Sequence, residues 1–242
     1  YRESCIKIVD HNGCTTVDLR YVSHRIYKGK PALAGLPATF VNNDDEASTL
    51  EITCIDKPTG LQATLFYTAF TNLDVITRSI TLKNTGEKPI EITRVLSACV
   101  DFDDDCYDMI TLNGSWARER HMERAPLHHG KQSIDSIKGE SSHQNNPFAA
   151  LVSHNADEDM GEAFGFNFVY SGNFFAQAEV TQHKKTRFVM GINPLDFGWK
   201  LESGEEFVAP EVVMVHSDSG IGKMSRTFHD LYRQNLIRGE YK

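Results

Sequence analysis

The sequence predicts an all-β domain, either a sandwich or a barrel. The first observation is a succession of short segments in which apolar or aromatic side chains occupy every second position, as in residues 50–54 and 164–169. The second is turn chemistry between such segments, for example at residues 58–60 and 84–86. Strands that recur at roughly 8–12-residue intervals between turns are typical of sandwiches and barrels. No repeat or linker interrupts them, so we expect one domain over residues 1–242.

Each expected strand follows from alternation or from β-branched residues between turn signals. In residues 15–21, three apolar side chains alternate with polar ones. Residues 50–70 form a hairpin candidate, because two strand-like segments flank a Pro-Thr-Gly turn. Residues 29–37 contain two glycines and two prolines, so we expect a loop there. The other expected strands lie in residues 6–8, 75–82, 90–102, 164–169, 176–180, 187–192, 199–201 and 212–215.

The end of the chain changes pattern and predicts an amphipathic connector helix over residues 223–239. Apolar side chains recur there at the i, i+4, i+7, i+8 and i+12 spacing of one helix face. This apolar stripe consists of Met224, Phe228, Leu231, Tyr232 and Leu236. Gly239 fits a helix stop signal. A helix after so many strands indicates a connection to a further part of a longer polypeptide.

Composition narrows the possible functions. The net charge of −8 argues against nucleic-acid binding, because a phosphate-binding surface needs an excess of Lys and Arg. No apolar run approaches the ~20 residues that span a bilayer, and no signal peptide is visible, so we expect no membrane association. The five cysteines are an odd number without CxxC spacing. This pattern indicates reduced thiols and a cytoplasmic location.

The segment from Asn113 to Phe148 departs from the strand pattern and is the main candidate for a functional surface. It concentrates planar side chains that hydrogen-bond or stack: Trp116, Arg118, Arg120, His121, Arg124 and His143. Excursions from a rigid sheet often carry specificity. The alternative is that the arginines form solvated ion pairs with Glu119 and Glu123 and that Trp116 plugs the core.

Other polar clusters do not predict a metal, a cofactor or a catalytic centre. The acidic cluster at residues 101–105 lacks the glycine and the terminal Glu of an EF-hand loop, so we expect a solvated loop. The adjacent His128 and His129 would point to opposite faces of an extended chain. No nucleophile or nucleotide-binding motif is present, and no carboxylate pair stands out as a glycosidase site.

Several stretches together resemble the N-terminal domain of bacterial α-galactosidases of glycoside hydrolase family 36. Two of the most specific are Asn-Gly-Ser-Trp-Ala-Arg-Glu-Arg-His at residues 113–121 and Gly-Ile-Asn-Pro-Leu-Asp-Phe at residues 191–197. The similar stretches run in the family's order over nearly the whole chain. The remaining ones are residues 23–31, 35–39, 132–136, 141–148, 170–174, 210–215 and 224–229, with Trp199.

The resemblance implies a β-supersandwich of the galactose-mutarotase-like kind, followed by a connector helix and then a (β/α)₈ barrel. In the family, the barrel holds the two catalytic aspartates of a retaining mechanism on terminal α-galactosides such as melibiose and raffinose. We therefore expect residues 1–242 to be a non-catalytic fragment without a cofactor, lacking both aspartates and the family's first strands. Its expected partners are its own barrel and neighbouring subunits, since such enzymes are often tetramers, and the α-galactoside substrate.

The resemblance assigns no catalytic role within this sequence. Tyr1-Arg2-Glu3 resembles the tail of the family's Asp-Phe-Arg loop, so Arg2 is a candidate for lining the substrate pocket. Trp116, Arg118 and His143 are further candidates for a pocket or an interface. Two alternatives stay open: a carbohydrate-binding module with Trp116 or Trp199 as a stacking platform, and an aldose epimerase. The epimerase would need a His, such as His121 or His143, and a Glu in one cleft.

Overall fold

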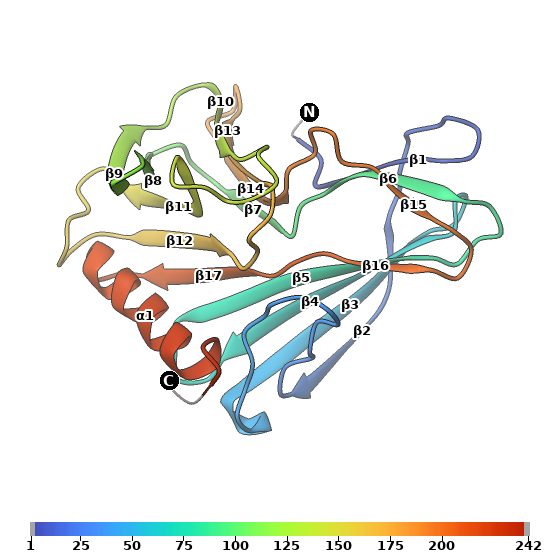
Figure 1. The fold of residues 1–242 in the computed structure, drawn as a ribbon, viewed down its shortest axis with the longest axis horizontal. Coiled ribbons are helices and arrows are strands. Elements are labelled where there is room, and N and C mark those ends of the chain that lie inside the picture. Colours follow the sequence, from blue (N-terminus) through green and yellow to red (C-terminus); the bar gives the residue numbers. More distant parts are fainter. Residues whose placement is uncertain (1–2, 240–242) are drawn as a thin grey trace.

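The computed structural model of the protein describes residues 3–239 of the 242. Its centre is a ten-stranded antiparallel sheet (Figure 1). Neighbouring strands along this sheet are β2 (Arg20–Lys28), β3 (Ala47–Asp56), β4 (Leu61–Phe70), β5 (Val75–Asn84), β17 (Val212–Ser217), β12 (Ala163–Phe168), β11 (Asn145–Ser153), β8 (Tyr107–Ser115) and β9 (Arg118–Pro126), with β16 (Glu206–Val208) paired to β5.

Two smaller sheets pack on one face of the large sheet, which makes the molecule an all-β sandwich. The four-stranded sheet contains β10 (Gly130–Asp135), β13 (Phe174–Val180), β14 (Thr186–Ile192) and β7 (Ala98–Phe102) in that order. The three-stranded sheet contains β1 (Ile6–Val9), β6 (Ile90–Val95) and β15 (Trp199–Leu201). The predicted fold class is confirmed.

Each small sheet buries its own core against the large sheet. Under the four-stranded sheet, Phe166 of β12 stacks on Phe188 of β14 with ring centroids 4.0 Å apart. Under the three-stranded sheet, Ile80 of β5 and Ile92 of β6 are fully buried in a second cluster. Burying a side chain of this size contributes about 1.5–3 kcal/mol, so these clusters hold the three sheets together.

The β3–β4 hairpin confirms the prediction for residues 50–70, although β3 begins earlier, at Ala47. Its turn depends on Gly60, whose φ of +76° is unfavourable for residues with a Cβ. A Cβ at this position would also lie 2.5 Å from the backbone nitrogen of Gly86 in the next turn. The loop expected at residues 29–37 is likewise present.

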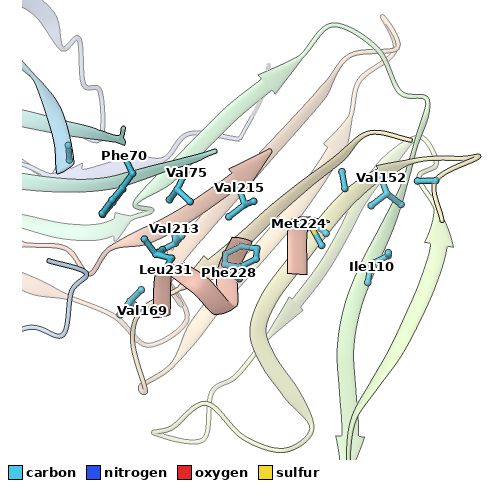
Figure 2. Packing of buried hydrophobic residues seen from close by; sticks show 14 residues of the cluster. Phe70, Val75, Ile110, Val152, Val169, Val213, Val215, Met224, Phe228 and Leu231 are labelled. Atoms are coloured by element: carbon cyan, nitrogen blue, oxygen red, sulfur yellow. The ribbon is translucent and has the colours of Figure 1, made fainter. Parts of the chain in front are cut away.

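The helix α1 (Gly220–Asn235) covers the other face of the large sheet (Figures 1 and 2). Phe228 and Leu231 pack against Val213 and Val215 of β17. The close approach requires Gly165 in β12, because a Cβ there would lie 2.5 Å from the ring of Phe228. The predicted apolar stripe therefore packs against the sheet, with Leu236 directly after the end of the helix.

The helix lies at residues 220–235, whereas the apolar pattern predicted residues 223–239. At its start, the N–H groups of Ile221 and Gly222 donate to the carbonyls of Asp157 and Glu158, so a distant turn caps the first helical residues. At its end, Asn235 exchanges two hydrogen bonds with Phe40: its carbonyl accepts from Phe40 N (2.7 Å) and its Nδ2 donates to Phe40 O (2.9 Å). Tertiary contacts, rather than a local glycine, therefore set both ends.

Two further expectations are wrong. The strand expected at residues 15–21 begins only at Arg20 and continues to Lys28 as β2. The segment 113–148 is not a polar excursion outside the sheets, because β9, β10 and the ends of β8 and β11 lie within it. All nine residues of β9 are exposed, so this strand has no buried face and no apolar alternation that could reveal it.

Candidate functional site

The candidate site is the β8–β9 hairpin, which we call the arm, together with the groove beside it. The base of the arm is held by Arg124 of β9. Its Nε donates to Asp108 Oδ2 of β8 (2.7 Å), and its two Nη atoms donate to the carbonyls of Ser153, His154 and Ala156 (2.6–3.0 Å). Charge-assisted bonds to several acceptors fix the arm to the β11–β12 turn.

Asp108 is the acidic centre of this anchor. Its Oδ1 also lies 2.7 Å from His154 Nδ1. Burial alone would raise the pKa of Asp108, but the hydrogen bonds from Arg124 and His154 lower it below its ordinary value. Asp108 is therefore a carboxylate at neutral pH, and the anchor is an ionic network.

The tip of the arm turns sharply and presents Trp116 to solvent. Trp116 is 82% exposed. Ala117 and Arg120 have φ values of 61° and 59°, which residues with a Cβ rarely adopt. Gly114 allows the strands to approach, because a Cβ there would lie 2.3 Å from the carbonyl oxygen of Arg118. A strained turn with an exposed tryptophan, on a rigid base, is typical of a recognition element.

The predicted site residues do not converge into one pocket. Arg118 begins β9 and is exposed, and His143 lies exposed in the loop before β11. That loop is joined to the arm by the hydrogen bond from Gly114 N to Gln144 O (3.1 Å). Among residues 3–239, however, no hydrogen bond or ion pair links Trp116, Arg118 and His143. Arg2, the fourth candidate, lies outside the described residues.

The alternative in which the arginines pair with Glu119 and Glu123 is wrong. Glu119 Oε1 accepts from the N–H of Ala117 (2.8 Å), which stabilises the turn at the tip. Glu123 Oε2 accepts from Asn113 Nδ2 (2.9 Å) across the arm. The same alternative has Trp116 plug the core, which is also wrong, since its side chain is in solvent. The arm thus presents cations and an aromatic ring outward.

A groove of about 700 Å³ separates the arm from α1. Its floor includes the hydrogen bond from Tyr232 Oη to Asn167 Oδ1 (2.6 Å), and burial raises the pKa of that phenol. The side chain of Asn167 in turn donates to the carbonyl of Pro147 (2.9 Å). The lining is mainly apolar. Its apolar side chains include Leu112, Met122, Phe148, Met224 and Phe228, and its polar ones include Arg120, Glu158 and His229.

A buried ion pair lies near the end of α1, and sequence reasoning missed it. Lys30 Nζ lies 2.5 Å from Glu211 Oε2, with side-chain exposures of 3% and 1%. Glu211 Oε1 also accepts from the N–H (2.8 Å) and the Oγ1 (2.7 Å) of Thr39. The loop that contains Lys30 and Thr39 is therefore pinned to the segment that leads into β17, beside the end of α1.

Two carboxylates of the acidic cluster at residues 101–105 form ion pairs. Asp101 accepts two hydrogen bonds from Arg187 (both 2.7 Å), and Asp103 Oδ1 accepts from Lys185 Nζ (2.6 Å). In the part of the chain that the structure describes, no group of three or more His, Cys, Asp or Glu side chains is placed to hold a metal ion. Within the same part, no helix is long and apolar enough to cross a membrane.

Comparison with known proteins identifies the family. The family model described as the glycosyl hydrolase family 36 N-terminal domain matches residues 1–202. The chain belongs to this family. A second family model, described as Melibiase, matches residues 206–242. The boundary between the two matches does not separate two packed bodies, because β17 and α1 bury their apolar faces against strands from the first match.

The relatives of this family 36 chain are α-galactosidases. It is 53% identical to α-galactosidase AgaA of Geobacillus stearothermophilus over 242 residues, covering 100% of this chain and 33% of the relative. It is 42% identical to α-galactosidase Mel36A of Lactobacillus acidophilus, covering 96% of this chain and 32% of the relative. The crystal structure of AgaB from G. stearothermophilus superposes with a TM-score of 0.99 at 53% identity, over 100% of this chain and 33% of that one. The chain spans about a third of the length of these relatives.

The two alternative functions gain no support from the geometry. Trp116 is exposed, but it stands at the tip of the arm and does not line the groove beside it. Trp199 is 49% exposed, and its ring contacts Phe207 with ring centroids 5.3 Å apart. Neither His121 nor His143 forms a hydrogen bond or an ion pair with a glutamate among residues 3–239. A sugar platform and a His–Glu catalytic pair are therefore both unsupported by the described residues.

Proposed function

We propose that this chain is the non-catalytic N-terminal domain of an α-galactosidase. The full polypeptide hydrolyses terminal α-galactosides such as melibiose and raffinose with retention of configuration. The domain packs against the catalytic part, contributes to the assembly of a homotetramer and helps to wall the substrate pocket. The cytoplasm is its compartment, a proposal supported by an odd number of cysteines without CxxC spacing.

One observation carries this proposal: residues 1–242 match, over their whole length, about one third of each of several longer enzymes. At 53% identity and a TM-score of 0.99, the family 36 relatives contain this whole domain and twice as much further chain. Variants of AgaA have been crystallised with raffinose and with stachyose, so at least one relative binds α-galactosides. Since residues 1–242 correspond to about a third of these relatives and no carboxylate pair stands out in the sequence, we place the chemistry in the remaining two thirds.

The assembly role is supported by the construction of the arm. Its base is fixed by the Arg124–Asp108 ion pair, while Trp116 and the cationic Arg118 face solvent at its tip. Tryptophan and arginine are enriched among the residues that dominate binding at protein interfaces. Trp116 and Arg118 do not line the groove of about 700 Å³ beside the arm, so their display fits a protein partner better than a free sugar.

Hydrolysis of an aryl α-galactoside tests the proposed activity. The full polypeptide should release the aryl group, and residues 1–242 alone should not. Turnover that co-purifies with residues 1–242 and disappears when one of its own Asp or Glu residues is mutated would refute the non-catalytic assignment.

Replacement of Trp116 by Ala in the full polypeptide tests the assembly role. Light scattering should detect a smaller assembly or a weaker one. Leu195→Ala is the matched control, because Leu195 is also an exposed apolar residue, with 55% exposure, outside the arm. Calorimetry with galactose tests the alternative of a sugar site. The assembly role would be contradicted if residues 1–242 bind galactose at millimolar concentration and Trp116→Ala abolishes this binding with the fold intact. That result would favour the carbohydrate-binding module.

A further inference from the structure

The segment before β1 lies across the four-stranded sheet, on the face turned away from the large sheet. The N–H of Glu3 donates to Glu179 Oε2 of β13 (2.8 Å), and the Glu3 carbonyl accepts from Arg187 Nη1 of β14 (3.1 Å). Two residues later, the carbonyl of Cys5 accepts from the N–H of Leu96 (2.8 Å), between β6 and β7. These bonds fix the backbone of this segment on both sheets.

The same bonds place Cys99 of β7 beneath this segment. Arg187 is the cross-strand partner of Asp101, and the residue before Cys5 in the chain order of anchors, Glu3, is bonded to Arg187 as well. Cys99 lies two positions from Asp101 on the same strand, so both side chains point to the face that carries Arg187. The Leu96 anchor lies three residues before Cys99. The two anchors therefore bracket Cys99 on the face that the segment covers.

The thiols of Cys5 and Cys99 meet at this point and are hydrogen-bonded to each other. Both residues are only partly buried, so neither is sealed in a core. An S–S bond is about 2.05 Å long, and two thiols in hydrogen-bond contact need only a small approach to form one. The pair joins segments far apart in the chain, without the CxxC spacing that would reveal it in the sequence.

Two guanidinium groups give the pair a cationic surrounding. The charges of Arg78 of β5 and Arg187 of β14 both act on the two thiols. Arg78 is 4% exposed, and its Nη1 donates to the carbonyl of Ser97 (2.8 Å). Its Nε has no hydrogen-bond partner among residues 3–239. Buried cationic groups beside a thiol favour its thiolate form.

The carboxylates beside the pair have cations of their own. The carboxylate of Glu3 accepts hydrogen bonds from Arg94 and Lys131. The carboxylate of Asp101 accepts two from Arg187 (both 2.7 Å). Neither carboxylate therefore brings an uncompensated negative charge to the thiols.

The two thiols differ in how readily they ionise. The hydrogen bond with Cys99, opposed by burial and aided by the charges of Arg78 and Arg187, lowers the pKa of the Cys5 thiol to about 6. The same hydrogen bond, together with burial, raises the pKa of the Cys99 thiol. Since the thiolate is the nucleophilic form, Cys5 is the reactive member and Cys99 keeps its proton.

We propose that Cys5 and Cys99 form a redox-modification site, at which a hydroperoxide converts the two thiols into a reversible disulfide. The Cys5 thiolate attacks the terminal oxygen of the peroxide, the O–O bond breaks, and Cys5 becomes a sulfenic acid while the departing oxygen takes a proton from water. The Cys99 sulfur then attacks the Cys5 sulfur, and hydroxide leaves with the Cys99 proton as water. The pair loses two electrons and the peroxide gains them. Disulfides in cytosolic proteins are usually of this transient, redox-sensing kind.

Peptide mass spectrometry of the full polypeptide tests whether the disulfide forms. The reduced protein would be treated with hydrogen peroxide, its remaining thiols blocked with N-ethylmaleimide in denaturant, and the product digested with trypsin. We expect a link between the peptides of residues 3–7 and 95–118 that dithiothreitol removes, with fragment ions placing it at Cys99 rather than at Cys106. The exposed Cys14 is the control and should carry the maleimide. Oxidation of Cys14 to the same extent as Cys5, or no linked peptide, would refute the inference.

Dimedone, which traps sulfenic acids, tests the order of the two steps. Cys99→Ser should accumulate trapped sulfenic acid at Cys5, because the serine hydroxyl can still donate to the Cys5 thiolate but cannot close a disulfide. Cys5→Ser should accumulate none at Cys99. Equal trapping in the two variants, or trapping at Cys99 alone, would overturn the assignment of Cys5 as the attacking thiol. The peptide link in the wild type needs neither variant to fold.

Discussion

The buried ion pair between Lys30 and Glu211 should be the polar interaction whose loss destabilises the protein most. The pair joins the loop before β3 to the segment before β17, and both side chains are almost fully buried. Lys30→Met leaves the Glu211 carboxylate buried with only the two hydrogen bonds from Thr39. Removal of one partner of a buried pair costs about 3–5 kcal/mol, mainly because the remaining charge is uncompensated.

The chain contains a matched control two residues away. Lys28 Nζ lies 2.5 Å from Asp45 Oδ1, the same separation as in the buried pair, but these side chains are 74% and 78% exposed. Lys28→Met should therefore leave stability unchanged within error, since solvent screens exposed pairs. Burial is the main difference between the two substitutions.

Urea unfolding followed by circular dichroism measures both variants. For an m-value of about 3 kcal/mol/M, Lys30→Met should lower the midpoint by about 1–1.7 M. Glu211→Gln should also lower it strongly, because it keeps an acceptor for Thr39 but leaves the Lys30 cation unpaired. If Lys30→Met shifts the midpoint no more than Lys28→Met, the pair does not have the structural role that we assign to it.

Three further predictions concern the helix and the segment before β1. Leu231→Ala, at a fully buried position, should cost about 2–5 kcal/mol, whereas Leu195→Ala, at a 55% exposed position, should not lower the melting temperature measurably. Gly165→Ala places a Cβ 2.5 Å from the ring of Phe228 and should cost about 1–3 kcal/mol; an unchanged melting temperature would show that the helix is not packed as described. Burial would raise the pKa of Glu3, but hydrogen bonds from Lys131 and Arg94 lower it from 4.5 to about 2. A depressed pKa stabilises the folded state above pH 4.5, and this contribution is lost as the pH falls towards 2. Thermal melts should therefore show a smaller acid loss for Glu3→Gln than for the wild type, and equal losses would contradict the assignment.

The predictable parts of the fold are those in which local pattern and tertiary burial agree. The hairpin at residues 50–70 was predictable because its strands flank a Pro-Thr-Gly turn. The packed face of α1 was predictable because five apolar residues share the helical period. Its ends were not, since Asp157 and Asn235 set them through contacts with distant segments.

The parts that could not be predicted depend on contacts between residues far apart in the chain, or on the solvent exposure of a strand or side chain. The strand β9 was not predicted, because an exposed strand has no apolar alternation. Lys30 and Glu211 gave no local signal, as neither position has an unusual neighbourhood in the sequence. The segment around Trp116 was identifiable from its composition, but only the structure distinguishes an exposed tip from a core plug.

Complementation tests the central claim most directly, because it asks whether the enzyme needs this domain. Residues 1–242 and the remainder of the polypeptide would be produced together and separately, and hydrolysis of an aryl α-galactoside would be measured. We predict that residues 1–242 are inactive alone and that the remainder gains activity when the two parts are combined. Full activity of the remainder without residues 1–242 would contradict a docking role for this domain in the proposed α-galactosidase.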